Sequence, residues 1–131
     1  MKGFVDNIET LTEDNEAFRR VLYTGKHLQL VLMALRPGED IGEEVHDDHD
    51  QFFRVETGEG EVWIDGASTR IKSDDAIIVP AGARHNVVNT GDTSLKLYTI
   101  YGPPDHRDGV VRATRAEAEA TEEHFDGTTT E

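Results

Sequence analysis

The sequence predicts an all-β protein, a closed or nearly closed sandwich or barrel that ends in a short helix. Apolar or alternating runs of strand length repeat through the middle of the chain. Turns rich in Gly, Asn, Asp and Pro separate these runs, and one of them, Asp65-Gly66, is a strong signal for a β-hairpin. Many short strands at this spacing are typical of antiparallel barrels and sandwiches.

The first half of this region contains a buried strand and a hairpin. Leu28–Leu35 is a continuous apolar run, and the Pro-Gly pair that follows it predicts a turn. Gly42–His46 is a shorter, alternating strand. Gln51–Gly66 holds two strand-like runs around the turn Thr57–Gly60, so we expect these two strands to pair.

The second half repeats the pattern. Ser68–Gly82 predicts another hairpin, and His85–Pro104 predicts two more strands around the turn Asn89–Asp92. We therefore assign residues 25–104 to the barrel. Residues 1–24 form an N-terminal segment, which either packs on its own barrel or is exchanged between two barrels.

The two ends of the chain differ from the barrel. Glu13–Arg20 predicts a helical turn that leads into a strand at Val21–Tyr23. Residues 105–131 form a C-terminal extension with a helix over Thr114–Phe125, because Thr114 and Glu117 have the spacing of a capping box. The last six residues, Asp126–Glu131, predict a disordered tail.

Composition excludes several classes of protein. The 131 residues suit one domain, and the absence of cysteine excludes disulfides and thiolate metal sites. The 13 basic and 27 acidic residues give a net charge of −14, which disfavours binding to nucleic acid or to an anionic membrane. No apolar run approaches the ~20 residues of a membrane span, and the N-terminus lacks a signal-peptide pattern, so we expect a cytoplasmic protein.

The acidic surface also suggests adaptation to high salt. Lysine is scarce, and dense salt screens the self-repulsion of such a coat, since the Debye length falls to roughly 3 Å at molar ionic strength. We hypothesise a salt-adapted, halophilic protein. An ordinary acidic protein is the alternative, and salt-dependent melting distinguishes the two.

Histidine and carboxylate residues gather at predicted strand starts. Glu44 and His46 are two residues apart, so on a strand they face the same side. Gln51 begins the next strand, and His85 opens a later one. Strand starts converge at the mouth of a small barrel, where two imidazoles, a carboxylate and an amide oxygen suit a divalent transition metal.

Each of these residues also has a purely structural interpretation. Glu44 is alternatively a solvated carboxylate, Gln51 a hydrogen-bond partner of a ligand or the backbone, and His85 a cap of its turn. His49 is three residues from His46 and so predicts a solvated turn residue, with replacement of Glu44 as a ligand as the alternative. His106 predicts a surface loop residue, or else an acid–base group at the barrel mouth.

Two segments carry a resemblance to a known family. Pro37–Gly60, PGEDIGEEVHDDHDQFFRVETGEG, resembles the first cupin motif, G-x5-H-x-H-x3–4-E-x6-G. Asp74–Asn89, DDAIIVPAGARHNVVN, resembles the second, G-x5-P-x-G-x2-H-x3-N. The chain departs from the family at Glu44 (His in the family), Gln51 (Glu) and Asp74 (Gly). The segment HDQFFRVETGEG is similar to the corresponding segment of small single-domain cupins called mannose-6-phosphate-isomerase-like.

The resemblance implies a cupin jelly-roll β-barrel with a metal at its mouth. Residue by residue, it implies Glu44, His46, Gln51 and His85 as ligands of Zn, Mn, Fe or Ni. Exchanging His for Glu and Glu for Gln leaves the ligand charge unchanged, so we expect the site still to bind a metal.

Two functions fit this site. The first is a metal-dependent enzyme of the isomerase or oxygenase type, acting on a small polar metabolite such as a sugar or carboxylate, with Glu44 or His106 as the candidate base. The second is a non-catalytic module that binds a small molecule such as a sugar and carries a structural metal. A wet cavity beside the metal favours the enzyme.

Apolar residues at consecutive positions predict a homodimer. Alternation sends neighbouring side chains to opposite faces of a strand, so one barrel interior cannot take all of them. The outward set must meet water, the N-terminal segment or a second chain, and a symmetric pair is the commonest closure. The residues concerned are Phe52, Phe53, Trp63, Ile64 and the run Leu28–Leu35, and the competing cover is Phe4–Tyr23 of the same chain.

Overall fold

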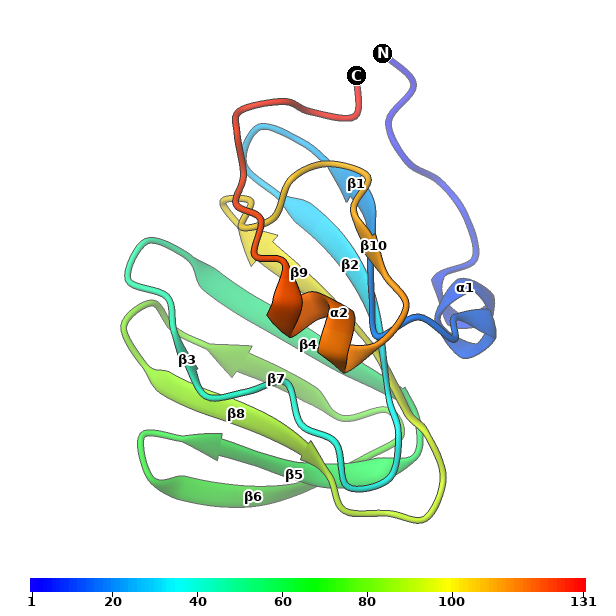
Figure 1. Cartoon of the computed structure of the whole chain (residues 1–131), viewed down its shortest axis with the longest axis vertical. Helices are drawn as coiled ribbons and strands as arrows, with labels where there is room; N and C mark the ends of the chain where they lie inside the picture. Colours follow the sequence, from blue (N-terminus) through cyan, green and yellow to red (C-terminus); the bar gives the residue numbers. More distant parts are fainter.

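The computed structural model describes residues 1–131 and contains two antiparallel sheets that face each other (Figure 1). Six strands form the first sheet in the order β10-β1-β2-β9-β4-β7, and four form the second in the order β3-β8-β5-β6. The strands are β1 (Arg19–Thr24), β2 (Gln29–Leu35), β3 (Glu44–Val45), β4 (Asp50–Thr57), β5 (Glu59–Ile64), β6 (Ala67–Lys72), β7 (Ala76–Val79), β8 (Arg84–Asn89), β9 (Leu95–Gly102) and β10 (Val111–Arg112).

Alternating side chains fill the space between the sheets. In β9 the buried and half-buried positions alternate without a break, and β4 follows the same pattern over its first six residues. The buried set forms one cluster whose central members, Phe53, Val55, Val87 and Leu97, are fully inaccessible. This arrangement confirms the prediction of an all-β jelly-roll barrel.

Several turns use the left-handed backbone region, and three of them bear on the sequence predictions. Asp65 and Gly66 both have positive φ (47° and 84°), which gives the predicted tight hairpin between β5 and β6. Gly58 has φ 92°, and a Cβ there would lie 2.6 Å from the Ser94 carbonyl oxygen, so only glycine fits. Asp74 has φ 76°, which explains why glycine is the residue that the resemblance leads one to expect at this position.

One predicted hairpin is wrong. Ser68–Gly82 contains β6 and β7, but β6 pairs with β5 in the smaller sheet and β7 pairs with β4 in the larger one. The connecting turn is closed by Asp75, which donates its N–H to the Lys72 carbonyl. The turn signal was correct, but a turn can equally lead the chain from one sheet to the other.

The N-terminal helix lies earlier than the sequence predicts. The helix α1 spans Ile8–Asp14 rather than a turn over Glu13–Arg20, because the Asn7 side chain caps it by accepting from the Thr10 N–H. It packs over the outer face of β9, β4 and β2. The N-terminal segment therefore covers part of its own barrel.

The C-terminal extension is more ordered than predicted. The helix α2 spans Arg115–Ala120, shorter than the expected Thr114–Phe125, and Thr114 caps it by accepting from the Glu117 N–H. The final residues, expected to be a disordered tail, lie along β1, where the Thr130 N–H donates to the Thr24 carbonyl. Neither helix has the length and apolar character that crossing a bilayer requires.

Candidate metal centre

Strand pairing brings two of the predicted ligands together. Glu44 on β3 and His85 on β8 are direct partners in the register of the smaller sheet, so their side chains lie side by side. His46 follows β3 immediately, and its carbonyl accepts a hydrogen bond of 2.8 Å from the Gly82 N–H. The Pro80–Gly82 turn thus holds His46 beside the start of β8.

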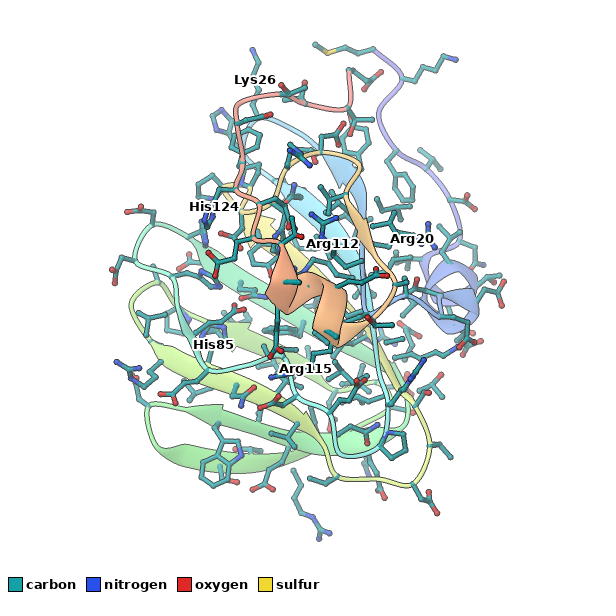
Figure 2. The ribbon with its side chains drawn as sticks, in the orientation of Figure 1. Arg20, Lys26, His85, Arg112, Arg115 and His124 are labelled. Carbon is teal, nitrogen blue, oxygen red and sulfur yellow. The ribbon has the colours of Figure 1, made fainter.

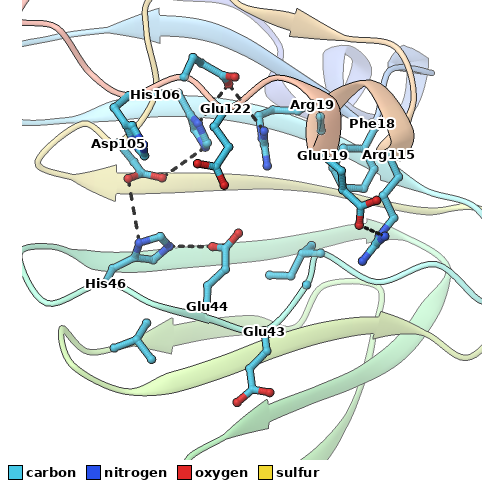
Figure 3. A pocket seen from close by; sticks show the side chains of 16 residues that line it. Phe18, Arg19, Glu43, Glu44, His46, Asp105, His106, Arg115, Glu119 and Glu122 are labelled. Carbon is cyan, nitrogen blue, oxygen red and sulfur yellow. Dashed lines mark hydrogen bonds and ion pairs between the residues drawn. The ribbon is translucent and has the colours of Figure 1, made fainter.

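Three donor groups converge at this point. One ligand atom each from Glu44, His46 and His85 lies within 4.8 Å of the others. The His46 Nε2 lies 2.7 Å from the Glu44 Oε2, a contact drawn in Figure 3, and the rings of His46 and His85 are 5.5 Å apart. The structure therefore brings together three of the four residues expected to bind a metal.

The hydrogen bonding of His85 leaves a free lone pair at the centre. The His85 Nδ1 lies 3.1 Å from the Ala83 carbonyl oxygen, so this nitrogen carries the proton. The Nε2 is then an acceptor, and it is buried with no hydrogen-bond partner in a residue that is 1% exposed. A bound cation would satisfy this lone pair, so the residues present fit a metal ion.

Gln51 lies at the start of β4 in the larger sheet and is 2% exposed. Its amide Nε2 donates to the Thr99 hydroxyl at 3.0 Å, which leaves the amide oxygen buried without a partner. An oxygen in this state suits a cation or a ligand proton. Whether Gln51 completes the ligand set stays a prediction.

The prediction that His49 is solvated is wrong, whereas its alternative role as a ligand stays a prediction. Its side chain is 11% exposed rather than solvated, and its ring lies 4.7 Å from the ring of His46. His49 belongs to a turn between β3 and β4, so the two-residue period of a strand does not apply to it. His46, His49 and Asp105 form a second group whose ligand atoms lie within 4.8 Å of one another.

His106 was expected on a surface loop but is only 7% exposed. Its Nε2 lies 3.3 Å from the Tyr101 hydroxyl and its Nδ1 lies 3.4 Å from the Glu123 carboxylate. Tyr101 is itself buried, and burial raises the pKa of its hydroxyl well above the ordinary value. No local pattern marks His106 as buried, because the residues around it come from other parts of the chain.

Charge pairing shifts the titration of the central groups. Burial is the largest single influence and opposes ionisation of both Glu44 and His46. Their mutual hydrogen bond and the neighbouring charges together outweigh it, so the pKa of Glu44 is lowered and that of His46 is raised. The Asp105 carboxylate also raises the pKa of His46. For His49, burial dominates and lowers its pKa.

A cavity of about 460 Å³ lies against this group, between β3 on one side and α2 with the segment after it on the other. Glu44, His46 and Asp105 face it (Figure 3). The two arginines that line it are already paired: Arg19 with Glu123, and Arg115 with Asp40 and Glu119. Figure 2 labels Arg115, the first residue of α2.

Comparisons with known proteins identify the family. Residues 31–101 match the cupin domain. The chain is 49% identical over 128 residues to the uncharacterized protein YrkC of Bacillus subtilis, covering 93% of this chain and 69% of that protein. A crystal structure of a Bacillus halodurans protein superposes with a TM-score of 0.90 at 49% identity, covering 92% of this chain and 96% of that one.

A more distant relative is named for its ligand. The oxalate-binding protein of Thermotoga maritima is 29% identical over 68 residues, which cover 52% of this chain and 56% of that protein. The cupin match, the order of the strands and the grouping of Glu44, His46 and His85 agree with one another. The chain belongs to the cupin family.

Proposed function

We propose that this protein is a metal-dependent enzyme that acts on a small polar metabolite, with Glu44, His46, His85 and Gln51 holding the ion. One observation carries the proposal: the buried Nε2 of His85 lacks a partner and belongs to a group of three donors beside a cavity of about 460 Å³. Cavities of this size accept a small metabolite.

The donor set favours a divalent transition metal. Two neutral imidazoles and one carboxylate suit Zn, Mn, Fe or Ni, whereas Ca and Mg prefer oxygen donors alone. When bound, such an ion supplies Lewis-acid polarisation of a substrate carbonyl or a site for dioxygen, which are the chemistries of isomerases and oxygenases.

The protein side chains would orient the metabolite and move its protons. Glu44 lines the cavity and is the nearest candidate base if it does not bind the ion. His106, which also lines the cavity, is the second candidate, although its two nitrogens face Tyr101 and Glu123. Arg19 and Arg115 already face carboxylates, at 3.6 Å and 2.7 Å, which supports a hydroxylated metabolite over a free carboxylate.

Metal binding to histidine variants tests the proposed site. We expect purified protein to take up about one ion per chain, and His46→Ala and His85→Ala each to lose most of this affinity, because each removes a ligand. Elemental analysis and calorimetric titration with Zn²⁺ and Mn²⁺ measure it. His27→Ala, which changes an exposed histidine in the turn between β1 and β2, is the matched control. Full stoichiometry in either His46→Ala or His85→Ala would contradict the assignment.

Turnover separates the enzyme from the alternative, a non-catalytic binding module. The metal-loaded protein is incubated with aldoses, ketoses and small hydroxy acids, with and without dioxygen, while melting temperature and product formation are followed. Product that disappears when Glu44 is replaced by Gln supports the enzyme. A metabolite that raises the melting temperature and is never converted would assign the binding module instead.

The partner proposed for this protein is a second copy of the same chain. On the outer face of the larger sheet, Leu30, Ile100, Phe52 and Ile78 occupy paired register positions and form one apolar row across four strands. The row ends at the edge strand β7, where Ile78 is 69% exposed. Since α1 covers only part of this face, a flat apolar row beside an open edge favours symmetric pairing.

Light scattering over a dilution series tests the dimer. We expect about twice the 14.6 kDa chain mass for the wild type and a lower mass for Ile78→Asp, because a carboxylate would be buried in the contact. Val111→Asp, an exposed apolar residue on the opposite edge strand, is the control. A mass near 14.6 kDa at every concentration would mean a monomer.

A further inference from the structure

A single carboxylate faces two imidazoles at the metal centre. The Asp105 Oδ1 lies 3.2 Å from the His49 Nε2 and 4.0 Å from the His46 Nδ1. The other nitrogen of His46 faces Glu44 at 2.7 Å, so this ring has a carboxylate on each side, as Figure 3 shows. Asp105 lies after the matched cupin residues 31–101, in the C-terminal extension.

We propose that Asp105 is a positioning residue, which orients the ring of His46 and holds His49 inward against the metal centre. The inference rests on the proposed function, in which the His46 Nε2 binds the ion together with Glu44 and His85. A carboxylate at the far nitrogen of a metal-binding histidine sets its tautomer, fixes its ring and raises its basicity. Asp105, whose Oδ1 faces the His46 Nδ1 from 4.0 Å, beyond hydrogen-bond length, is the carboxylate placed to act on this nitrogen through its charge.

The backbone of Asp105 is fixed from within the barrel. Gln29, on β2, is 0% exposed. Its side-chain oxygen accepts from the N–H groups of Asp105 (3.1 Å) and His106 (2.9 Å), and its amide donates to the His106 carbonyl at 2.8 Å. One buried amide thus clamps both residues, and a clamp of this kind is what precise positioning of the Asp105 carboxylate requires.

The inward position of His49 needs a compensating partner. The turn that carries it also contains Asp47 and Asp48, both of which are exposed, so the turn itself does not draw side chains inward. The His49 ring packs 4.7 Å from His46 and 5.8 Å from Tyr101, and its Nε2 is buried without a well-formed hydrogen bond. Burying this nitrogen is unfavourable unless a polar group faces it, and the Asp105 carboxylate, 3.2 Å away, is the group that does so.

The second oxygen of the Asp105 carboxylate contacts other residues of the extension. Oδ2 lies 3.5 Å from the His106 Nε2, and the His106 Nδ1 lies 3.4 Å from Glu123. Glu123 is held in turn by Arg112 at 3.1 Å. The second oxygen of Asp105 thus faces the polar groups of the extension, while the first faces His46 and His49.

Metal affinity measures the role of Asp105. We expect Asp105→Asn to bind Co²⁺ and Zn²⁺ roughly 10–100-fold more weakly in competition with a chelator, as for other carboxylates behind a ligating histidine. Asp47→Asn removes the same charge one residue from His46 but faces solvent, so its affinity should stay close to that of the wild type. Equal affinities for Asp105→Asn and the wild type would overturn the proposal.

A second readout needs no metal. The ¹⁵N resonances of the imidazoles in metal-free protein report tautomer and surroundings, and we expect those of His46 and His49 to change in Asp105→Asn but not in Asp47→Asn. Asp105→Glu keeps the charge at a longer reach and should give resonances closer to the wild type. Unchanged His46 and His49 resonances in Asp105→Asn would refute the positioning role.

The two readouts separate this inference from the proposed function. If the wild type binds no transition metal, the proposed function fails, while the imidazole resonances still decide whether Asp105 orients the rings. If the wild type binds metal and Asp105→Asn binds it equally well, only the positioning role fails. Loss of a ligand from the visible Co²⁺ spectrum of saturated Asp105→Asn would make Asp105 a direct ligand, which also contradicts it.

Discussion

The barrel and the C-terminal extension are both well packed, but different forces hold them. In the barrel, fully inaccessible residues such as Phe53 and Leu97 form a single apolar cluster between the sheets. In the extension, a charged side chain is deeply buried: Glu123, whose side chain is 3% exposed, lies between Arg112 and His106. The candidate metal centre lies where these two regions meet.

This difference explains how the side chains of the site are held in position. Apolar packing has no preferred direction and places a strand only as a whole, whereas ion pairs and hydrogen bonds fix single side chains. The barrel positions Glu44 and His85 by strand register. The extension adds Asp105 and His106 through directed polar contacts, which suits residues whose orientation matters for chemistry.

The barrel should respond most strongly to loss of apolar volume. Replacing Phe53 by Ala removes a fully buried ring and leaves a cavity, so we expect the free energy of unfolding to fall by about 3–5 kcal/mol. Urea denaturation followed by circular dichroism measures it. Phe52→Ala, one residue away on the outer face, should lower the free energy of unfolding clearly less. Equal losses in the two variants would mean that the burial of the side chain does not determine the size of the loss.

The extension should respond most strongly to loss of a charge. Glu123→Gln leaves Arg19, Arg112 and His106 without their carboxylate, and we expect a loss of about 2 kcal/mol, the scale of hydrogen bonds to charged groups. The neighbouring exposed Glu122→Gln is the control and should change little. A neutral effect of Glu123→Gln would show that apolar packing alone holds the extension.

The pKa of Glu123 predicts how its contribution to stability changes with pH. Burial alone would raise the pKa of Glu123, but the His106 hydrogen bond and the charges of Arg19 and Arg112 outweigh it and lower the pKa below the ordinary value. This carboxylate therefore stabilises the fold above the ordinary pKa of glutamate, and the contribution is lost as the pH falls through the lowered value. Glu123→Gln should lose that part of the acid dependence.

The same contrast explains what the sequence predicts and what it does not. The strands and the grouping of Glu44, His46 and His85 follow from alternation, turn residues and motif spacing, which are local. The inward side chains of His49 and His106 depend on Asp105, Tyr101 and Glu123, far along the chain, and no local period reports such partners. The sequence predicts the turn between β6 and β7. That this turn leads the chain from the smaller sheet to the larger one depends on the fold as a whole.

A smaller effect is expected at the start of α2. The Thr114 hydroxyl accepts from the Glu117 N–H, and Thr114→Ala should cost about 1 kcal/mol because one N–H at the helix start loses its partner. Thr121→Ala, at the other end of α2, removes a similar side chain without a capping role and is the control. Thermal melting of the metal-free proteins compares them; equal melting temperatures would show that α2 is held by its ion pairs rather than by its cap.

The smallest expected effect is a stabilisation by salt. It distinguishes the contribution of exposed surface charges to stability from that of the buried ion pairs. With a net charge of −14, exposed carboxylates repel one another, and KCl shortens the Debye length from about 10 Å at 0.1 M to about 3 Å at 1 M. We expect the melting temperature to rise by a few degrees over this range. The Glu123 contacts are shielded from solvent and should not weaken. Amide exchange at Val21 and Phe125, whose N–H groups donate to the Val110 and Asp105 carbonyls of the extension, should therefore not accelerate. A melting temperature independent of KCl would remove the case for salt adaptation, and faster exchange at these two amides alone would show that the extension is held by surface charges that salt can screen.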